Sequence, residues 1–133
     1  MVMIKSPAVR KFMSVSPITI GPAANRSEAL ALMRAKKIHH MPVCESGRVV
    51  GLVTDGDLAE LNPGADGKVN VKDLMRTKPY TVSPESPVAE VVREMAGHRY
   101  GSAAVVVDNG RVVGMFTATD GLRAFAEFLG PAR

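Results

Sequence analysis

The chain has 133 residues, of which 46% are hydrophobic and 23% are charged, and its formal net charge is +4. This length and composition indicate one compact globular body. No apolar run approaches the roughly 20 residues of a membrane-spanning helix, and the N-terminus lacks the apolar core of a signal peptide. The single cysteine, Cys44, excludes an internal disulfide. We therefore expect a cytoplasmic protein without membrane insertion.

The positive charge favours anionic partners such as nucleotides, nucleic acid or acidic lipid. The lysines and arginines are dispersed along the chain and form no long basic block. The sequence contains no helix-turn-helix, zinc-finger or aromatic RNA-binding pattern, and it contains no tryptophan. Nucleic-acid binding is therefore not expected.

The first predicted elements are a helical turn over 9–13 and a strand over the β-branched segment PITI at 17–20. Asn25, with Glu28 three residues later, predicts the start of a capped helix. The apolar face of this helix comprises Ala29, Leu30, Leu32 and Met33. A hairpin follows over 41–54, with its turn at Ser46-Gly47, and a last helix begins near Asp57.

The segment NPGADGK at 62–68 predicts a linker. After it the same order of elements returns: a helical turn over 71–75, a strand in PYTV, a helix, a hairpin and a final helix near Asp120. Ser86 is predicted to cap the middle helix, with Pro87 at the first helical position. The inward face of that helix comprises Val88, Val91, Val92 and Met95. The second hairpin turns at Asn109-Gly110.

The two halves are copies of one another. When Val9 is placed on Val71, Met13 falls on Met75, and the segment GRVVG at 47–51 recurs at 110–114. The fold class is therefore α/β, with β-α-β-β-α in each copy. We divide the chain into copy one at 1–61, the linker, and copy two at 69–133. A unit of this size is marginally stable alone, so the copies are expected to share buried surface.

Each copy ends its last strand at a threonine and has an aspartate three residues later: Thr54 and Asp57, then Thr117 and Asp120. A strand that ends where a helix begins presents backbone N–H groups to a phosphate. A carboxylate at that spacing is placed to accept hydrogen bonds from ribose. Helix capping by the same residues is the alternative, and duplication does not decide between the two.

The segments SPITI and KIHHMPVCESGRVVGLVTDGDL, with their second copies, resemble cystathionine-β-synthase (CBS) domains, and the pair resembles a Bateman module. The resemblance covers about 9–129. It implies two units packed sheet to sheet with pseudo-twofold symmetry, and adenosine derivatives bound in the clefts between them. It also implies that Asp57 and Asp120 bind ribose and that Thr54 and Thr117 help to hold phosphate. By the same resemblance, adenine lies beside Ile18, Thr19 and Pro42.

Nucleotide-binding members of that family often carry basic residues just before the proline, where this chain has His39 and His40. Both could bind phosphate as cations, or could be ordinary surface histidines. A zinc site made by both with Cys44 is disfavoured, because neighbouring strand residues point to opposite faces. Copy two has Gly101-Ser102-Ala103-Ala104 here, so we expect unequal sites, with the stronger nucleotide grip at copy one.

The predicted function is that of a stand-alone regulatory module that binds AMP, ADP or ATP and signals by a conformational or oligomeric change. Two alternatives remain: a sensor of S-adenosylmethionine, and a ligand-free module that docks on an enzyme or transporter. No catalytic residues, metal site or catalytic cofactor are indicated. The resemblance implies a homodimer formed through helices. An apolar stripe on the last helix is interpreted as core, with a partner surface as the alternative: Leu122, Phe125, Phe128 and Leu129.

Overall fold

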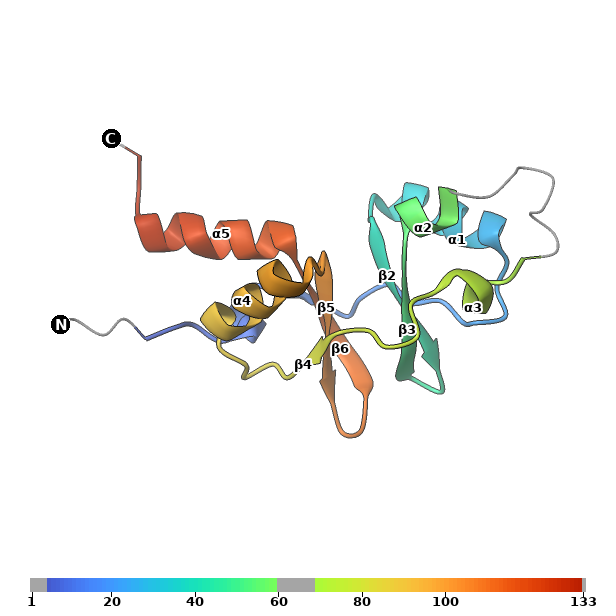
Figure 1. The fold of residues 1–133 in the computed structure, drawn as a ribbon, viewed down its shortest axis with the longest axis horizontal. Helices are drawn as coiled ribbons and strands as arrows, with labels where there is room; N and C mark the ends of the chain where they lie inside the picture. The colour runs from blue at the N-terminus through green and yellow to red at the C-terminus, as the bar shows by residue number, and fades with distance from the viewer. Residues whose placement is uncertain (1–4, 60–68, 133) are drawn as a thin grey trace. The chain divides into compact units, whose positions relative to one another are not determined.

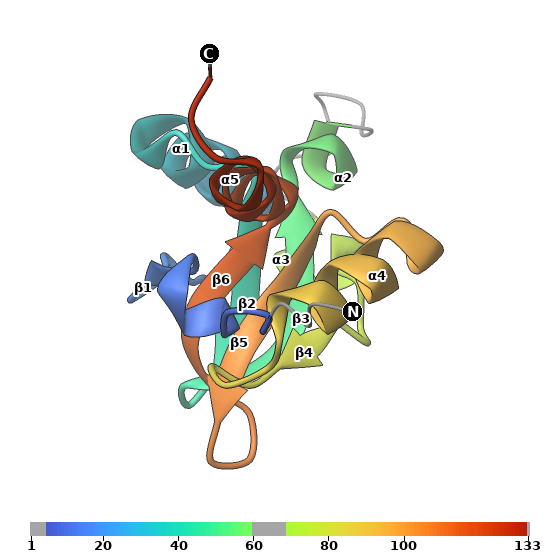
Figure 2. The same ribbon diagram turned by 90° about the vertical axis from the view of Figure 1, so that its left-hand side faces the viewer.

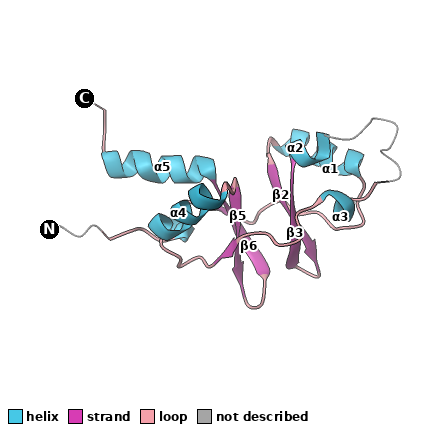
Figure 3. Ribbon diagram, in the orientation of Figure 1, coloured by secondary structure: helices cyan, strands magenta, loops and turns pink. Residues whose placement is uncertain are grey.

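The computed structural model describes residues 5–59 and 69–132. The linker predicted at 62–68 lies outside the described residues. The fold is mixed α/β (Figures 1 and 3), and the chain divides into two compact units. The hairpin-one unit consists of Pro17–Pro79 with Asn109–Val112, and the hairpin-two unit consists of Met1–Ser16, Tyr80–Asp108 and Val113–Arg133.

The hairpin-one unit is built on the antiparallel strands β2 and β3. Its elements are α1 (Arg26–Lys36), β2 (His40–Glu45), β3 (Arg48–Thr54), α2 (Asp55–Ala59) and α3 (Val71–Leu74). The hairpin turns at Ser46 and Gly47, whose φ angles are 51° and 78°, as the sequence predicted. Helices α1 and α2 lie side by side (Figure 1). The buried cluster comprises Ala29, Met33, Met41, Val43, Val53, Leu58 and Val71.

Two local predictions for this unit have different outcomes. The side chain of Asn25 accepts a hydrogen bond from the Glu28 N–H at 2.8 Å, which confirms the predicted helix cap. The strand predicted at 17–20 is reduced to one bridge, in which Ile20 pairs with Val43. The regular strand β1 lies earlier, at Ser14–Val15, and belongs to the other unit.

The hairpin-two unit repeats this plan around β5 and β6. Its elements are the 3₁₀ helix η1 (Val9–Lys11), β1, β4 (Thr81–Val82), α4 (Val88–His98), β5 (Ser102–Val107), β6 (Arg111–Thr117, whose first two residues group with the hairpin-one unit) and α5 (Ala118–Leu129). Strand β4 pairs in parallel with β5, and β1 pairs antiparallel with β6. The buried cluster comprises Val9, Phe12, Val82, Val88, Val91, Met95, Ala103, Val105, Phe116 and Ala124.

The predicted cap of α4 by Ser86 is wrong. Its hydroxyl accepts the Ser83 N–H at 3.0 Å, in the turn before the helix, and Pro87 occupies the N-cap position. The first N–H groups of α4, which have no acceptor within the helix, donate to residues near the N-terminus of the chain instead. Ala89 donates to Ser6 Oγ and Val88 donates to the Pro7 carbonyl, both at 2.9 Å. The cap of α4 therefore comes from more than 80 residues away in sequence.

The leading segments of the two copies are exchanged between the units. Residues 5–16 of copy one lie in the hairpin-two unit, beside β6 (Figure 2), and residues 69–79 of copy two lie in the hairpin-one unit. Gly51 and Gly114 show why both copies keep the last glycine of GRVVG. A Cβ on Gly51 would come within 2.9 Å of the Arg76 carbonyl, and one on Gly114 within 2.8 Å of the Ser14 carbonyl. Each glycine thus lets an exchanged segment cross its strand.

The interpretation of the last helix as an apolar core stripe is wrong. Its large apolar side chains are exposed: Leu122 67%, Phe125 57%, Phe128 61% and Leu129 64%. The face of α5 that packs inward carries small residues instead, because a Cβ on Gly121 would lie only 3.2 Å from Val92 of α4, and Ala124 is buried. Across the described parts of the chain, no helix has the length and apolarity required to traverse a bilayer.

Candidate functional site

The hairpin-one corner is the turn from β3 into α2, where the sequence places Thr54 and Asp57. The Thr54 N–H donates to Asp57 Oδ2 at 3.2 Å, and the Asp57 N–H donates to Thr54 Oγ1 at 3.1 Å. The two residues therefore form a reciprocal cap, as their spacing suggests. The Asp57 side chain remains 23% exposed, so its carboxylate can accept further hydrogen bonds.

Two histidines border this corner and differ in environment. His39 is exposed, and its Nδ1 lies 2.7 Å from Asp55 Oδ2; this hydrogen bond holds the pKa of the Asp55 carboxyl below its usual value. His40 is opposite Thr54 in the β2–β3 register. Burial lowers the pKa of His40, and its Nδ1 is buried without a hydrogen-bond partner among the described residues.

Arg76 also lies at the hairpin-one corner, and sequence reasoning missed it. Its N–H and carbonyl both pair with the backbone of Leu52, at 2.8 and 3.1 Å, which fixes the exchanged segment to β3. Its Nε lies 3.9 Å from Asp57 Oδ2, and its side chain is 60% exposed. The repeat could not reveal it, because the matching residue of copy one is Ser14.

The hairpin-two corner is the turn from β6 into α5, with Thr117 and Asp120. Asp120 Oδ2 accepts the Thr117 N–H at 2.9 Å and its hydroxyl at 3.3 Å. Asp120 Oδ1 accepts from Arg123 Nη2 at 2.6 Å, and that nitrogen also donates to the Phe12 carbonyl at 2.8 Å. The Asp120 side chain is only 8% exposed. This carboxylate is therefore more enclosed and more heavily hydrogen-bonded than that of Asp57.

Both corners adjoin a buried polar atom that has no partner. Among the described residues these atoms are His40 Nδ1 and Ser102 Oγ. They occupy the same position in the two copies, at the first residue of β2 and of β5. A buried polar group without a hydrogen bond is unfavourable, by about 1–3 kcal/mol. An unpartnered buried polar atom therefore recurs at equivalent positions beside the two corners.

The residues expected beside adenine lie in the hairpin-one unit. Pro42 is buried in β2, two cross-strand pairs beyond the pair of His40 and Thr54, and its carbonyl accepts the Ile20 N–H at 3.1 Å. This bond places the segment containing Ile18 and Thr19 along β2. Ile18 packs against the buried cluster, whereas Thr19 is exposed.

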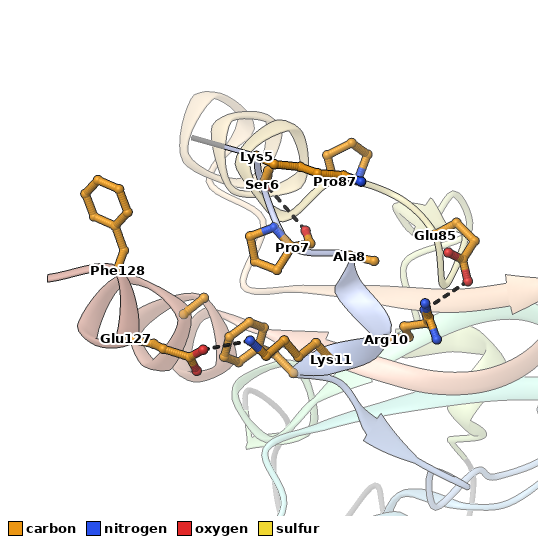
Figure 4. A pocket seen from close by; sticks show the side chains of 12 residues that line it. Lys5, Ser6, Pro7, Ala8, Arg10, Lys11, Glu85, Pro87, Glu127 and Phe128 are labelled. Atoms are coloured by element: carbon orange, nitrogen blue, oxygen red, sulfur yellow. Dashed lines mark hydrogen bonds and ion pairs between the residues drawn. The ribbon is translucent and has the colours of Figure 1, made fainter. Parts of the chain in front are cut away.

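A hollow lies in the hairpin-two unit, between the leading segment and α5 (Figure 4). Two ion pairs span it: Lys11 with Glu127 at 2.7 Å, and Arg10 with Glu85 at 3.1 Å. Because these pairs engage four of the five charged side chains that line the hollow, all but Lys5, we interpret it as the contact that fastens the leading segment. Within residues 5–59 and 69–132, no cluster of histidine, cysteine and acidic side chains could hold a metal ion.

Comparison with known proteins gives a consistent result. A family model described as the CBS domain matches residues 9–64 and 71–127. An inosine-5′-monophosphate dehydrogenase of Korarchaeum cryptofilum is 35% identical over 103 residues, which are 77% of this chain and 21% of the enzyme. This chain therefore spans about a fifth of that relative's length.

Solved structures resemble the chain over most of its length. The CBS domain pair of protein MJ0100, in complex with 5′-methylthioadenosine and S-adenosyl-L-methionine, has a TM-score of 0.82 and 29% identity, covering 90% of this chain and 96% of that one. CBSX2 in complex with AMP has a TM-score of 0.80 and 26% identity, covering 92% of this chain and 98% of that one. Both likenesses extend through the two copies.

Proposed function

The chain belongs to the CBS domain family, and from this premise we propose that it is a regulatory CBS pair that binds an adenosine derivative at its strand-to-helix corners. The observation that carries the proposal is the recurrence of an unpartnered buried polar atom, at His40 and Ser102, beside both corners. The adenosine compounds in complex with the MJ0100 pair and with CBSX2 support this ligand class. The family match leaves no part of this chain long enough for a catalytic domain.

The residues divide into three roles at the hairpin-one corner. The Asp57 carboxylate, which already orders the corner through the Thr54 N–H, accepts hydrogen bonds from the ribose hydroxyls. Thr54, His39 and His40 face the phosphates, and His40 Nδ1 gains the partner that it lacks. The segment of Ile18 and Thr19, held along Pro42, receives the adenine.

The hairpin-two corner binds the same class of ligand more weakly. Thr117 and Asp120 provide the matching hydroxyl and carboxylate, but Asp120 is already bonded to Arg123 and is 8% exposed. Binding there requires a ribose to compete with that ion pair. We therefore propose unequal sites, with AMP, ADP or ATP held more tightly at the hairpin-one corner and S-adenosylmethionine as the alternative ligand.

Thermal unfolding in the presence of adenosine compounds tests the proposal. A ligand that binds only the folded chain adds about 2.7 kcal/mol of stability at 100 times its Kd, so the unfolding temperature should rise with AMP, ADP, ATP or S-adenosylmethionine. Asp57→Ala should lose most of this rise, measured against its own unliganded state, whereas Glu45→Ala, at the exposed end of β2, should keep it. A panel that leaves the wild-type transition unmoved contradicts ligand binding.

A docking module is the second candidate, favoured by the exposed apolar face of α5. Contiguous exposed apolar side chains on a small protein mark an interaction surface. The occupants we propose are a second copy of this chain, giving a homodimer, or a regulated enzyme or transporter. Phe125→Glu, at a side chain 57% exposed, should leave the unfolding temperature nearly unchanged but convert a dimer to monomer in light scattering. Wild-type chain that is already monomeric rules out the homodimer.

A further inference from the structure

The two corners differ in where their arginine comes from and in what it binds. At the hairpin-two corner Arg123 belongs to α5 and is held by two acceptors, Asp120 Oδ1 and the Phe12 carbonyl, at 2.6 and 2.8 Å. At the hairpin-one corner Arg76 belongs to the exchanged segment, and its contact with Asp57, at 3.9 Å, is too long for a hydrogen bond. The Arg76 guanidinium therefore keeps its donors for another anion.

Building on the proposed function, we infer that Arg76 binds a phosphate of the ligand, so that the hairpin-one corner selects phosphorylated adenosines while the hairpin-two corner takes adenosine compounds without phosphate. The guanidinium presents a planar set of donors that matches phosphate oxygens. A nucleotide whose ribose is bonded to Asp57 carries its phosphate next to that ribose. An arginine beside the same carboxylate is therefore in reach of the phosphate.

The charges around Arg76 support this assignment. Arg76 lies 3.9 Å from Asp57, and its charge acts on His40 together with those of His39, Asp55 and Asp57. Asp55 is engaged by His39 at 2.7 Å, and Asp57 by the Thr54 N–H. Both carboxylates thus already have hydrogen-bond donors. Arg76, which has a side chain 60% exposed, is a permanent cation beside the carboxylate proposed to bind the ribose.

The hairpin-two corner has neutral residues at the three positions that match the basic residues of the hairpin-one corner. Ser14 stands where copy two has Arg76, and Gly101 and Ser102 stand where copy one has His39 and His40. A phosphate there would meet the unpartnered Ser102 hydroxyl and the Asp120–Arg123 ion pair, whose guanidinium already donates to Asp120 and to the Phe12 carbonyl. An uncharged 5′ substituent needs no cation at that place.

Calorimetric titration with AMP, adenosine and 5′-methylthioadenosine tests the inference on the full chain. The variant Arg76→Gln retains the backbone pairing with Leu52, and Lys72→Gln, at an exposed position of α3, is the control that loses the same charge. A hydrogen bond to a charged group contributes about 1.5–3 kcal/mol, so Arg76→Gln should weaken AMP binding about tenfold or more. It should change adenosine and 5′-methylthioadenosine binding less than about twofold, and Lys72→Gln should match wild type throughout.

The results separate this inference from the function on which it rests. Wild type that binds none of the three compounds contradicts the proposed function itself. AMP affinity that is equal in Arg76→Gln and Lys72→Gln overturns only the role of Arg76. An equal loss for AMP and adenosine also overturns it, because Arg76 would then be needed for the shape of the corner and not for phosphate. For the other corner, Ser102→Ala should weaken 5′-methylthioadenosine more than AMP, and the reverse order refutes the assignment.

Discussion

Met13 of copy one lies against Gly114 of copy two, so that a Cβ on this glycine would approach its Sδ to 2.7 Å. The matching pair, Met75 and Gly51, makes the same contact in the other unit. In each case a methionine and the carbonyl after it cross a strand at its one residue without a side chain. The exchange of leading segments thus depends on a glycine that the repeat preserves.

Gly114→Ala should therefore destabilise the protein. The added methyl group would overlap the Ser14 carbonyl, which is backbone and cannot rotate away, and forced overpacking typically costs about 1–3 kcal/mol. Urea unfolding measures the loss. Gly97→Ala is the matched control, because its Cβ would meet nothing within 4 Å and it lies in α4, where alanine is the better helix former. Equal stability of the two variants would contradict the crossing contact.

Ser6→Ala should fray the start of α4. Loss of an N-cap hydroxyl costs about 1 kcal/mol, and the Ala89 amide would lose its acceptor at 2.9 Å. Hydrogen exchange should show faster exchange at Ala89 in this variant. Ser86→Ala should leave Ala89 protected, because the Ser86 hydroxyl accepts a hydrogen bond from the Ser83 N–H and not from α4. The reverse pattern would restore Ser86 as the cap.

Replacing the two corner aspartates by asparagine should have unequal effects on stability. Asp120→Asn removes the charge that pairs with Arg123 at 2.6 Å in an enclosed site, and hydrogen bonds to charged groups contribute about 1.5–3 kcal/mol. Asp57→Asn disturbs a more exposed carboxylate with a looser arginine contact, so it should cost less. Chemical denaturation of both variants without ligand gives the comparison, and a larger loss for Asp57→Asn would contradict the geometry.

Stability should decrease in mild acid because of His40. Burial is the main cause that lowers the pKa of His40 below its ordinary value of 6.5, with further contributions from His39 and Arg76 and opposition from Asp55 and Asp57. The unfolded chain then binds this proton more readily than the folded chain, so the free energy of unfolding is highest above pH 6.5 and falls as the pH drops below it.

Urea unfolding between pH 7.5 and 5, in steps of about half a unit, measures this dependence. His40→Gln should flatten the slope below pH 6.5, whereas His98→Gln, at an exposed position on α4, should keep it. When the titration is extended below pH 3.8, a second decline should follow from the lowered pKa of Asp55, because its charge-assisted hydrogen bond to His39 is lost when the carboxyl is protonated. A slope that is unchanged in His40→Gln would assign the acid sensitivity to another group.

The parts of the structure that depend on neighbouring residues follow from the amino-acid sequence alone. The turns at Ser46-Gly47 and Asn109-Gly110 follow from residues that tolerate positive φ, and the Asn25 cap follows from a side chain that reaches three residues ahead. The pairing of Thr54 with Asp57 is of the same kind, since a strand end and the first helical turn bring them together. Local geometry allows one solution in each case.

The surface that each segment covers depends on the tertiary fold. Ser6 caps α4, and Arg76 lies near Asp57, because each leading segment belongs to the unit of the other copy. The sequence of neither segment shows in which unit it lies. Similarly, the stripe on α5 has the spacing of a core face, yet close contact of Gly121 with Val92 brings the small residues inward and leaves Phe125 exposed. The side chains of a segment determine which of its faces can be buried, whereas the course of the whole chain determines which residues that segment contacts.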